Sequence, residues 1–552
     1  MKTDIEIAHE CEMEKIKKVA KKLSIPKKYL IPYGRYMAKV DGHLMKELEE
    51  KEDGHLILVT STNPTPFGEG KTTMAIGIHD AFCEMGISSV AVLREPSLGP
   101  VFGLKGGATG GGYAQVMPME QINLHFTGDM HALTSANNLL CAAIDNHIMQ
   151  GNELKIDSAT IQVPRALDMN DRALRDITIA QGKKDGVERK DHFVITVATE
   201  LMAILCLSKD LKDLKRRIGN ILMAYDEDGK PLYVRDLHCE GAMAVLLKEA
   251  IHPNLVQTLE HHPVLVHGGP FANIAHGCNS LIATKMGLKL ADYVVTEAGF
   301  GSDLGATKFL DIKSRIGGLS PSCIVLNTTI RSLKYNAGIT KEEVEKPNLE
   351  ALKKGIVNLD AHLDLLSHYT SSIVVCINHF IKDTEEEINY VKKYVEDRGF
   401  SCEVSTSFEE GGKGSQALAQ KIIESCHKQP LKTIYNIEDS IENKIETLVT
   451  NLLHSKVTYT DEALENIRFI EKHHLDHYPI CIAKTPYSLT DQAKKLGYPK
   501  GETVTVKLVK VQTGAGFIVV YMGNIMTMPG LPKKPNLLSI DLDDQDEIVG
   551  LF

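Results

Sequence analysis

A short apolar run, a glycine-containing loop and a helical pattern follow one another in residues 55–86, and this stretch constrains the fold most strongly. Residues 56–59 are apolar, long enough for a strand buried on both faces and too short for a helix. Residues 72–85 follow a helical pattern. A strand, a loop and a helix in this order direct backbone N–H groups and a helix N-terminus at a phosphate. The stretch therefore predicts a phosphate-binding loop (P-loop) in an α/β fold.

The loop fits the nucleotide-binding pattern G-x-x-x-x-G-K-[ST] with one departure, because Thr65 stands at the first glycine position. The Lys71 ammonium can reach terminal phosphates, and the hydroxyl of Thr72 or Thr73 can bind the accompanying Mg²⁺. The alternative is a solvated Gly/Lys turn without a ligand. The predicted ATP-binding residues are Thr65, Pro66, Phe67, Gly68, Glu69, Gly70, Lys71, Thr72 and Thr73.

Length and charge narrow the class of protein. A chain of 552 residues predicts one large domain with one or two smaller ones. The net charge of −10 argues against a general surface for nucleic acid or anionic membranes. No run reaches the roughly 18 apolar residues of a membrane span, and the first 23 residues lack a signal-peptide core. The eleven cysteines form no C-x-x-C pair, which favours free thiols in a reducing cytoplasm.

A second apolar run at residues 88–95 predicts a strand parallel to the first, because a helix joins the two. Arg94 and Glu95 then emerge near the phosphate loop. A guanidinium there can hold a carboxylate or an acyl phosphate with two hydrogen bonds, so Arg94 is a substrate-binding candidate. The alternative is a structural arginine that pairs with Glu95 or another acid.

The segment 96–129 is too rich in glycine for regular structure. Gly106 and Gly107 are among the glycines that let the backbone approach a ligand closely. The segment ends in polar groups suited to proton transfer or cation binding, namely His125 and Asp129, with His131 just beyond. Helix capping explains Asp129 equally well, because a helical pattern begins at residue 131.

Strand and helix patterns then alternate along the chain, which predicts a mostly parallel sheet with helices on both faces. Ligands of such sheets bind at the carboxyl ends of the strands. A charged segment at 341–354 suggests a boundary, and two alternating runs around residues 513–516 predict a β-hairpin. The expected domains are a P-loop domain over 1–355, a second, smaller α/β domain over 356–480 and a small β-containing domain over 481–552.

Two aromatic residues follow strands predicted in the second domain. Phe380 and Phe408 can stack on a flat heterocycle there, or they pack at an edge. The histidine pairs at 261–262 and 473–474 lack nearby partners in the sequence, and no metal site is predicted at either pair.

Several stretches together resemble the formate–tetrahydrofolate ligase family, also called 10-formyltetrahydrofolate synthetases. They span nearly the whole chain in one order: NPTPFGEGKTT at 63–73, REPSLGPVFGLKGGATGGGYAQVMPMEQINLHFTGD at 94–129, DRALR at 171–175, GPFANIAHGCNS at 269–280, VTEAGFGSDLGATKF at 295–309, RSLK at 331–334, KTPYSL at 484–489 and MTMPGLP at 526–532.

The resemblance implies that ATP and formate give formyl phosphate, whose formyl group passes to N10 of tetrahydrofolate. Lys71 would stabilise the phosphoryl group in transfer, Thr72 would help to hold Mg²⁺, and Arg94 would bind formyl phosphate together with Gly106 and Gly107. Asp129 or His125 would take the N10 proton. The resemblance also implies a homotetramer and activation by a monovalent cation, K⁺ or NH₄⁺.

In the family, aromatic residues of the second domain bind the folate, which assigns that role to Phe380 and Phe408. The chain departs from the family here, because Phe408 stands where tryptophan is typical and Ile381 where proline is expected. The ring of Phe408 is smaller than that of tryptophan. We expect this difference to affect the affinity for the pterin or the preference for polyglutamylated folate more than the reaction itself.

Two other functions fit the same loop. One is an ATP-dependent ligase that activates another acid for another amine. The other is a nucleotide-driven switch or partitioning ATPase, because Thr65 makes the loop atypical. The long glycine-rich segment after Arg94 favours a ligase, since a switch protein has no use for such a pocket.

Overall fold

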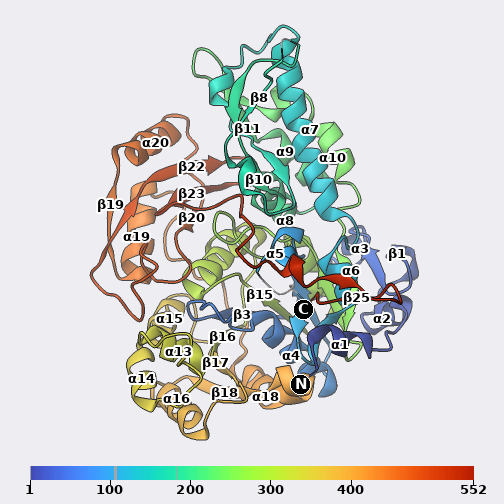
Figure 1. Cartoon of the computed structure of the whole chain (residues 1–552), viewed down its shortest axis with the longest axis vertical. Helices are drawn as coiled ribbons and strands as arrows, with labels where there is room; N and C mark the ends of the chain where they lie inside the picture. Colours follow the sequence, from blue (N-terminus) through green and yellow to red (C-terminus); the bar gives the residue numbers. More distant parts are fainter. Residues whose placement is uncertain (1, 105–108, 183, 552) are drawn as a thin grey trace.

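The computed structural model describes residues 2–104, 109–182 and 184–551, and a large sheet forms its centre (Figure 1). Within the described residues this sheet has twelve strands, and its main path runs β1-β2-β13-β14-β4-β15-β3-β16-β17-β18. The strands from β14 to β18 along this path are parallel, whereas β1, β2 and β13 pair antiparallel. In path order the strands are Leu30–Tyr33, Met37–Val40, Asn254–Thr258, Pro263–Val266, Ser89–Leu93, Tyr293–Glu297, His55–Ser61, Cys323–Thr328, Ile373–Asn378 and Ser401–Ser405. The mixed α/β class with a mainly parallel sheet is confirmed.

Alternate residues of β3 enter two different hydrophobic cores, which shows that both faces of the sheet are covered. Leu56 and Leu58 belong to one core, and Ile57 and Val59 belong to the other. Helix α4 (Lys71–Glu84) and helix α18 (Gln416–Ser425) pack on the second face. Helix α11 (Leu281–Leu290) packs on the first. The run at 56–59 therefore forms a strand buried on both faces, as its composition predicts.

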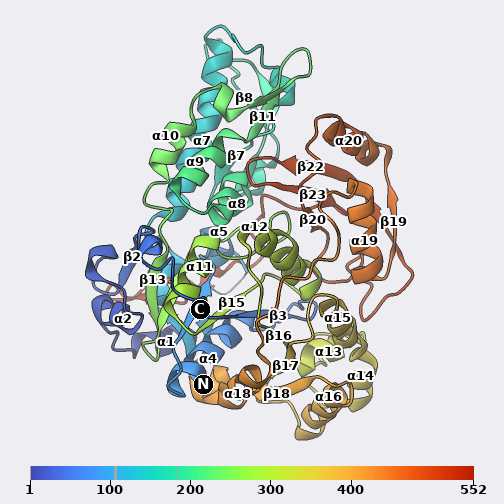
Figure 2. The same ribbon diagram turned by 180° about the vertical axis from the view of Figure 1, so that it is seen from behind.

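Residues 150–182 and 184–250 form a lobe beside the sheet, together with helix α7 (Asp129–Met149) (Figures 1 and 2). Helix α10 (Glu240–Leu246) packs against α7, and α9 (Leu211–Gly219) packs against α10. The described residues of the lobe include short strand pairs: β7 (Arg165–Leu167) with β10 (Phe193–Ile195), β8 (Ile177–Ile179) with β9 (Arg189–Asp191), and β11 (Leu222–Tyr225) with β12 (Pro231–Tyr233). None of the described helices is long and apolar enough to cross a lipid bilayer.

The strands of residues 356–480 do not form a sheet of their own. β17 and β18 extend the central sheet beyond β16, so the expected boundary near residue 355 does not separate two sheets. Helices α15 (Val357–Ser367), α16 (Glu385–Asp397), α19 (Ile441–Leu453) and α20 (Asp461–Lys472) also lie in this region. The division into domains itself stays a prediction.

The predicted C-terminal hairpin is confirmed, since β22 (Leu508–Gln512) and β23 (Phe517–Tyr521) pair antiparallel. β20 (Ile480–Ala483) joins β23 in parallel. A separate parallel pair joins β19 (Lys456–Tyr459) to β21 (Thr503–Val506). β19 lies before residue 481, where the C-terminal domain was expected to begin. The tail then returns to the first helix, because Leu551 shares a small core with Ile5 and Ala8.

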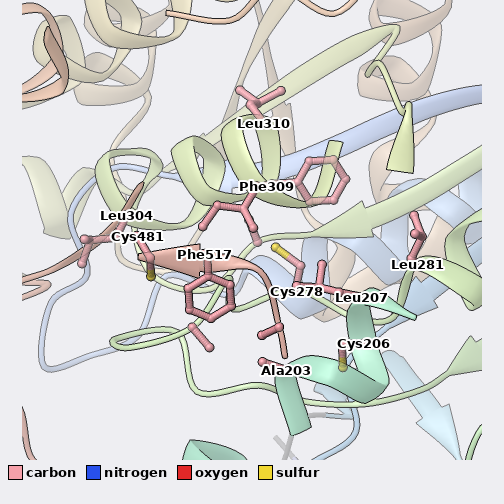
Figure 3. Close-up of a cluster of buried hydrophobic side chains, with 14 of the residues drawn as sticks. Ala203, Cys206, Leu207, Cys278, Leu281, Leu304, Phe309, Leu310, Cys481 and Phe517 are labelled. Carbon is pink, nitrogen blue, oxygen red and sulfur yellow. The ribbon is translucent and has the colours of Figure 1, made fainter. Parts of the chain in front are cut away.

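A buried cluster joins the C-terminal strands to the rest of the chain (Figure 3). Phe517 and Cys481 come from β23 and β20, and Phe309 begins the π-helical segment Phe309–Ser314. Helix α8 (Glu200–Leu207) contributes Cys206 from the other side. Phe517 is only 1% exposed, so its ring is one of the principal contacts that hold this unit in place.

We expect Phe517→Ala to lower the free energy of unfolding by about 3–5 kcal/mol, since the substitution leaves a cavity that the neighbours cannot fill. Leu538→Ala is the matched control because Leu538 is 70% exposed. Urea unfolding followed by circular dichroism measures both. Equal midpoints for the two variants would contradict the role of this cluster.

Candidate active site

The loop between β3 and α4 crosses the carboxyl edge of the sheet, and hydrogen bonds between its own residues hold its shape. The Thr65 amide and hydroxyl both donate to Glu69 Oε1, at 2.7 and 2.8 Å. Thr65, at the place of the first glycine, thus supplies a bond that glycine lacks. Burial raises the pKa of the Glu69 carboxyl.

Two asparagines at the ends of neighbouring strands hold the same loop by its backbone. Asn327 and Asn378 each donate from Nδ2 to the carbonyl oxygen of Glu69, at 2.5 and 3.1 Å. Gly70 follows in the left-handed conformation, φ 69°, and a Cβ there would lie 2.6 Å from Asn378 Nδ2. Glycine is therefore required at position 70 for its dihedral angle and for space.

The remaining loop residues differ in exposure. Pro66 and Gly68 are exposed, whereas Thr73 is buried in the first turn of α4. The Phe67 ring meets the edge of the Tyr335 ring, at 5.9 Å between centroids. Lys71 Nζ donates to Ser61 Oγ at 3.2 Å, so the ammonium lies near the end of β3.

Thr72, Glu297 and Arg94 meet beside the loop. The Thr72 hydroxyl donates to Glu297 Oε2 at 2.9 Å, and Arg94 Nη2 lies 3.5 Å from Glu297 Oε1. They converge because β15, which ends at Glu297, lies between β3 and β4. Arg94 meets Glu297 rather than Glu95, and its buried Nε has no hydrogen-bond partner within the part of the chain that the structure describes. The guanidinium thus keeps donor capacity for an anion.

Asp129 and His125 lie in opposite environments. Asp129 is 2% exposed, and its two oxygens accept from Lys39 Nζ at 2.8 and 2.9 Å. Asn254 Nδ2 donates to the same carboxylate at 2.9 Å. Burial and the charge of Asp129 raise the pKa of the neighbouring Glu95 carboxyl. His125 is exposed. The contacts of Asp129 are those of a buried ion pair.

The two aromatic candidates follow neighbouring strands but contact different groups. The Arg331 guanidinium lies 3.6 Å from the centroid of the Phe380 ring. The Phe408 carbonyl accepts from the Tyr113 amide at 2.9 Å, and a Cβ on Gly112 would lie 2.1 Å from this oxygen. The end of the glycine-rich segment therefore packs against the loop of Phe408. Gly106 and Gly107 lie outside the described residues.

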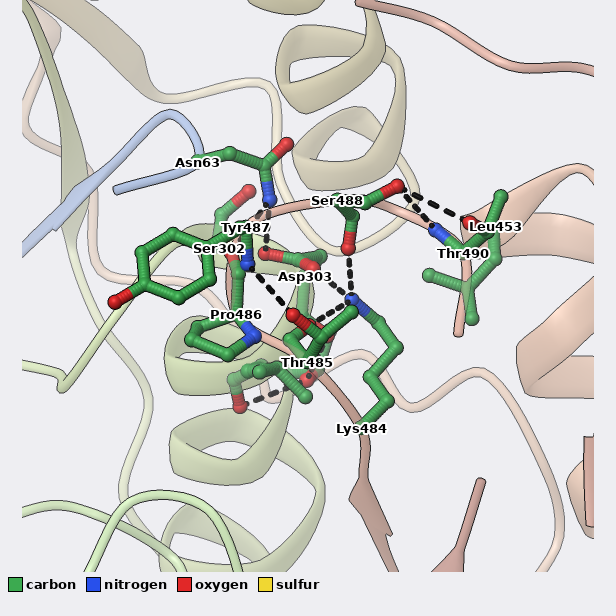
Figure 4. A network of polar contacts seen from close by, with 12 residues as sticks. Asn63, Ser302, Asp303, Leu453, Lys484, Thr485, Pro486, Tyr487, Ser488 and Thr490 are labelled. Atoms are coloured by element: carbon green, nitrogen blue, oxygen red, sulfur yellow. Dashed lines mark hydrogen bonds and ion pairs between the residues drawn. The ribbon is translucent and has the colours of Figure 1, made fainter. Parts of the chain in front are cut away.

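A polar network joins the C-terminal segment to the start of the loop (Figure 4). Lys484 Nζ and Asp303 Oδ2 form a fully buried ion pair at 2.5 Å. Asn63 Nδ2 donates to Asp303 Oδ1 at 3.3 Å and to the Pro486 carbonyl at 3.2 Å. His362 Nε2 hydrogen-bonds Asn63 Oδ1 at 3.0 Å, and Ser302 Oγ lies 2.6 Å from His362 Nδ1. Segments near residues 63, 303, 362 and 484 thus meet at one edge of the sheet.

Sequence reasoning gave no role to Glu297 or Arg331, and it missed Asn327 and Asn378. Both asparagines are polar residues at or near the carboxyl end of a buried apolar strand, Cys323–Thr328 for the first and Ile373–Asn378 for the second. A polar residue at the carboxyl end of a buried strand is the sequence signal that could have identified them, because ligands of parallel sheets bind at that edge.

We expect Asp129→Asn to lower the free energy of unfolding by about 3–5 kcal/mol, because the buried Lys39 ammonium loses its counter-charge. Urea unfolding measures the change, with the exposed Asp228→Asn as control. Unchanged stability combined with lost turnover would instead assign Asp129 to proton transfer.

A second prediction concerns pH. Burial lowers the pKa of His362 from 6.5 to about 4, so the unfolded chain takes up a proton that the folded chain does not as the pH falls through this window. The free energy of unfolding therefore declines with falling pH. We expect His362→Gln to reduce the loss between pH 7 and pH 5 by roughly 2 kcal/mol, measured by urea unfolding at both values. The exposed His477→Gln should leave the loss unchanged.

A family model described as formate–tetrahydrofolate ligase matches residues 2–552, which is essentially the entire chain.

Proposed function

The chain belongs to the formate–tetrahydrofolate ligase family, a family of ligases, and we propose that it joins formate to tetrahydrofolate with ATP. In the proposed first step a formate oxygen attacks the γ-phosphorus, the bond to the bridging β-phosphate oxygen breaks, and formyl phosphate and ADP form. N10 of tetrahydrofolate then attacks the formyl carbon, phosphate leaves, and the N10 proton passes to a base. The product is 10-formyltetrahydrofolate.

The observation that carries this proposal is the meeting of Arg94, Glu297 and Thr72 beside the loop that begins α4. Phosphoryl transfer needs little covalent chemistry from a protein and depends on positioning and on charge stabilisation. In the proposal Lys71 and the loop amides stabilise the γ-phosphoryl group. Arg94 holds formate and then formyl phosphate with the guanidinium donors that Glu297 leaves available, together with the backbone of Gly106 and Gly107.

Mg²⁺ binds oxygen ligands, and the Thr72 hydroxyl and the buried Glu297 carboxylate are oxygen donors 2.9 Å apart. These two residues therefore fit the ion, and in the proposal they hold it beside the phosphates. When bound, Mg²⁺ neutralises charge on the phosphate oxygens.

For the folate we propose the surface that follows β17 and β18. The Phe380 ring already stacks on the Arg331 guanidinium, and a pterin is a flat ring of similar shape. Phe408 offers less stacking area than the tryptophan typical of the family. His125 is exposed and can take up the N10 proton directly, whereas Asp129 would first have to leave Lys39. The homotetramer, the cytoplasmic location, polyglutamylated folate as substrate and activation by K⁺ or NH₄⁺ belong to the proposal through the family resemblance.

The test is formation of 10-formyltetrahydrofolate from ATP, formate and tetrahydrofolate, measured after acid conversion to the methenyl form. We expect product only with all three substrates. Arg94→Ala should lower kcat by about 10²–10³-fold, because charge on the reacting oxygens loses a positioned donor. Arg468→Ala, at an exposed arginine, is the control.

Two results would redirect the assignment. ATP hydrolysis without a folate product would support the nucleotide-driven switch, and product from another acid or amine would support a different ligase. Full activity of Arg94→Ala would remove Arg94 from the reaction while leaving the family assignment intact.

A further inference from the structure

Away from the phosphate loop, one group of three metal-ligating side chains stands out among the described residues. Asp80, Glu260 and His262 place ligand atoms within 4.8 Å of one another. Asp80 lies in the C-terminal half of α4, and the other two lie in the turn between β13 and β14. The expectation that the pair at 261–262 lacks metal-binding partners is therefore wrong for His262. Its partner Asp80 is 182 positions away in the chain.

The spacing of the three groups suits a small divalent ion. His262 Nδ1 lies 2.8 Å from Asp80 Oδ1 and 3.9 Å from Glu260 Oε2. Around an ion bound at about 2.1 Å, tetrahedral ligands lie about 3.4 Å apart, which is between these two distances. One imidazole with two carboxylates is a donor set of zinc-class ions rather than of Ca²⁺, which takes oxygen ligands.

Two buried oxygens of the cluster are available to a cation. Asp80 is fully buried, and within the described chain neither its Oδ2 nor Glu260 Oε2 has a hydrogen-bond partner. An unpartnered buried oxygen is costly. One imidazole stands beside two carboxylates, so hydrogen bonding to His262 alone leaves the group incomplete.

The cluster is fastened to the loop that carries Phe408 and is accessible from solvent. The Gly412 amide donates to Glu260 Oε1 at 2.7 Å, and a Cβ on Gly411 would lie 2.2 Å from that oxygen. A cavity of about 490 Å³ reaches Glu260, and Glu409 and Glu410 add negative charge to its wall. Cations can therefore approach the cluster from this side.

We propose that Asp80, Glu260 and His262 bind one divalent transition-metal ion of the zinc class, which ties the 406–412 loop to helix α4. The ion replaces the proton on His262 Nδ1 and satisfies the two unpartnered carboxylate oxygens. It is separate from the Thr72 and Glu297 pair, and its test does not require ligase activity.

Co²⁺ is the probe, because its visible absorption reports nitrogen and oxygen ligands. The full chain is treated with a chelator, dialysed without nucleotide and titrated with Co²⁺. We expect uptake of about one ion per chain, with absorption that Zn²⁺ abolishes, and a loss of affinity of at least about tenfold in His262→Gln. His477→Gln is the control for an exposed histidine, and Glu297→Gln should retain the ion.

Thermal melting and hydrogen exchange provide a second readout. Zn²⁺ should raise the melting temperature of the wild type and slow amide exchange in residues 406–412, with neither effect in His262→Gln. Should that variant fail to fold, Glu260→Gln serves in its place, with a cooperative metal-free melt as evidence of folding. The proposal is overturned if the wild type takes up no Co²⁺, if His262→Gln binds it equally well, or if uptake disappears in Glu297→Gln.

Discussion

The carbonyl oxygen of Glu69 is the point from which the loop between β3 and α4 takes its shape. Asn327 and Asn378 both donate to it, and they stand side by side because β16 and β17 are neighbouring parallel strands. The Glu69 carboxylate meanwhile binds Thr65. With its backbone and its side chain both held, the loop needs little rearrangement to present its amides. Donors held in place before the reaction are the ones that stabilise developing charge most effectively.

Buried ion pairs hold distant segments around the same edge of the sheet. Lys484 binds Asp303, Lys39 binds Asp129, and Lys334 binds Glu387 at 3.0 Å. Each pair joins elements far apart in the chain and excludes water from both partners. Such pairs add little net stability compared with apolar packing, but a lost partner leaves an uncompensated charge. Their effect here is to restrict the relative positions of the segments that surround the loop.

Local patterns in the sequence predicted the elements next to the loop, because apolar periodicity reports burial of nearby residues. Residues 56–59 lie in β3, and the helix expected at 72–85 is α4. The order of the strands was beyond such patterns, since pairing of β15 between β3 and β4 depends on contacts across more than 200 residues. Local patterns also do not report which distant side chains meet, such as Glu297 with Thr72, Lys39 with Asp129 and Asp80 with His262. β17 and β18 were assigned to a second domain because no local sequence pattern shows that they extend the central sheet.

Helix α4 physically connects the two regions to which the substrates are assigned. Its N-terminus follows the loop that begins after β3, and its middle touches the loop that carries Phe408. A Cβ on Gly77 would lie 2.0 Å from Ser407 Oγ, and one on Gly412 would lie 2.8 Å from the Asp80 backbone. Contacts this close leave no room for a side chain or a water layer, so the two regions cannot shift independently along the helix. The loop that precedes α4 and the loop that carries Phe408 are thus both held against the same helix, one at its first turn and the other at its middle.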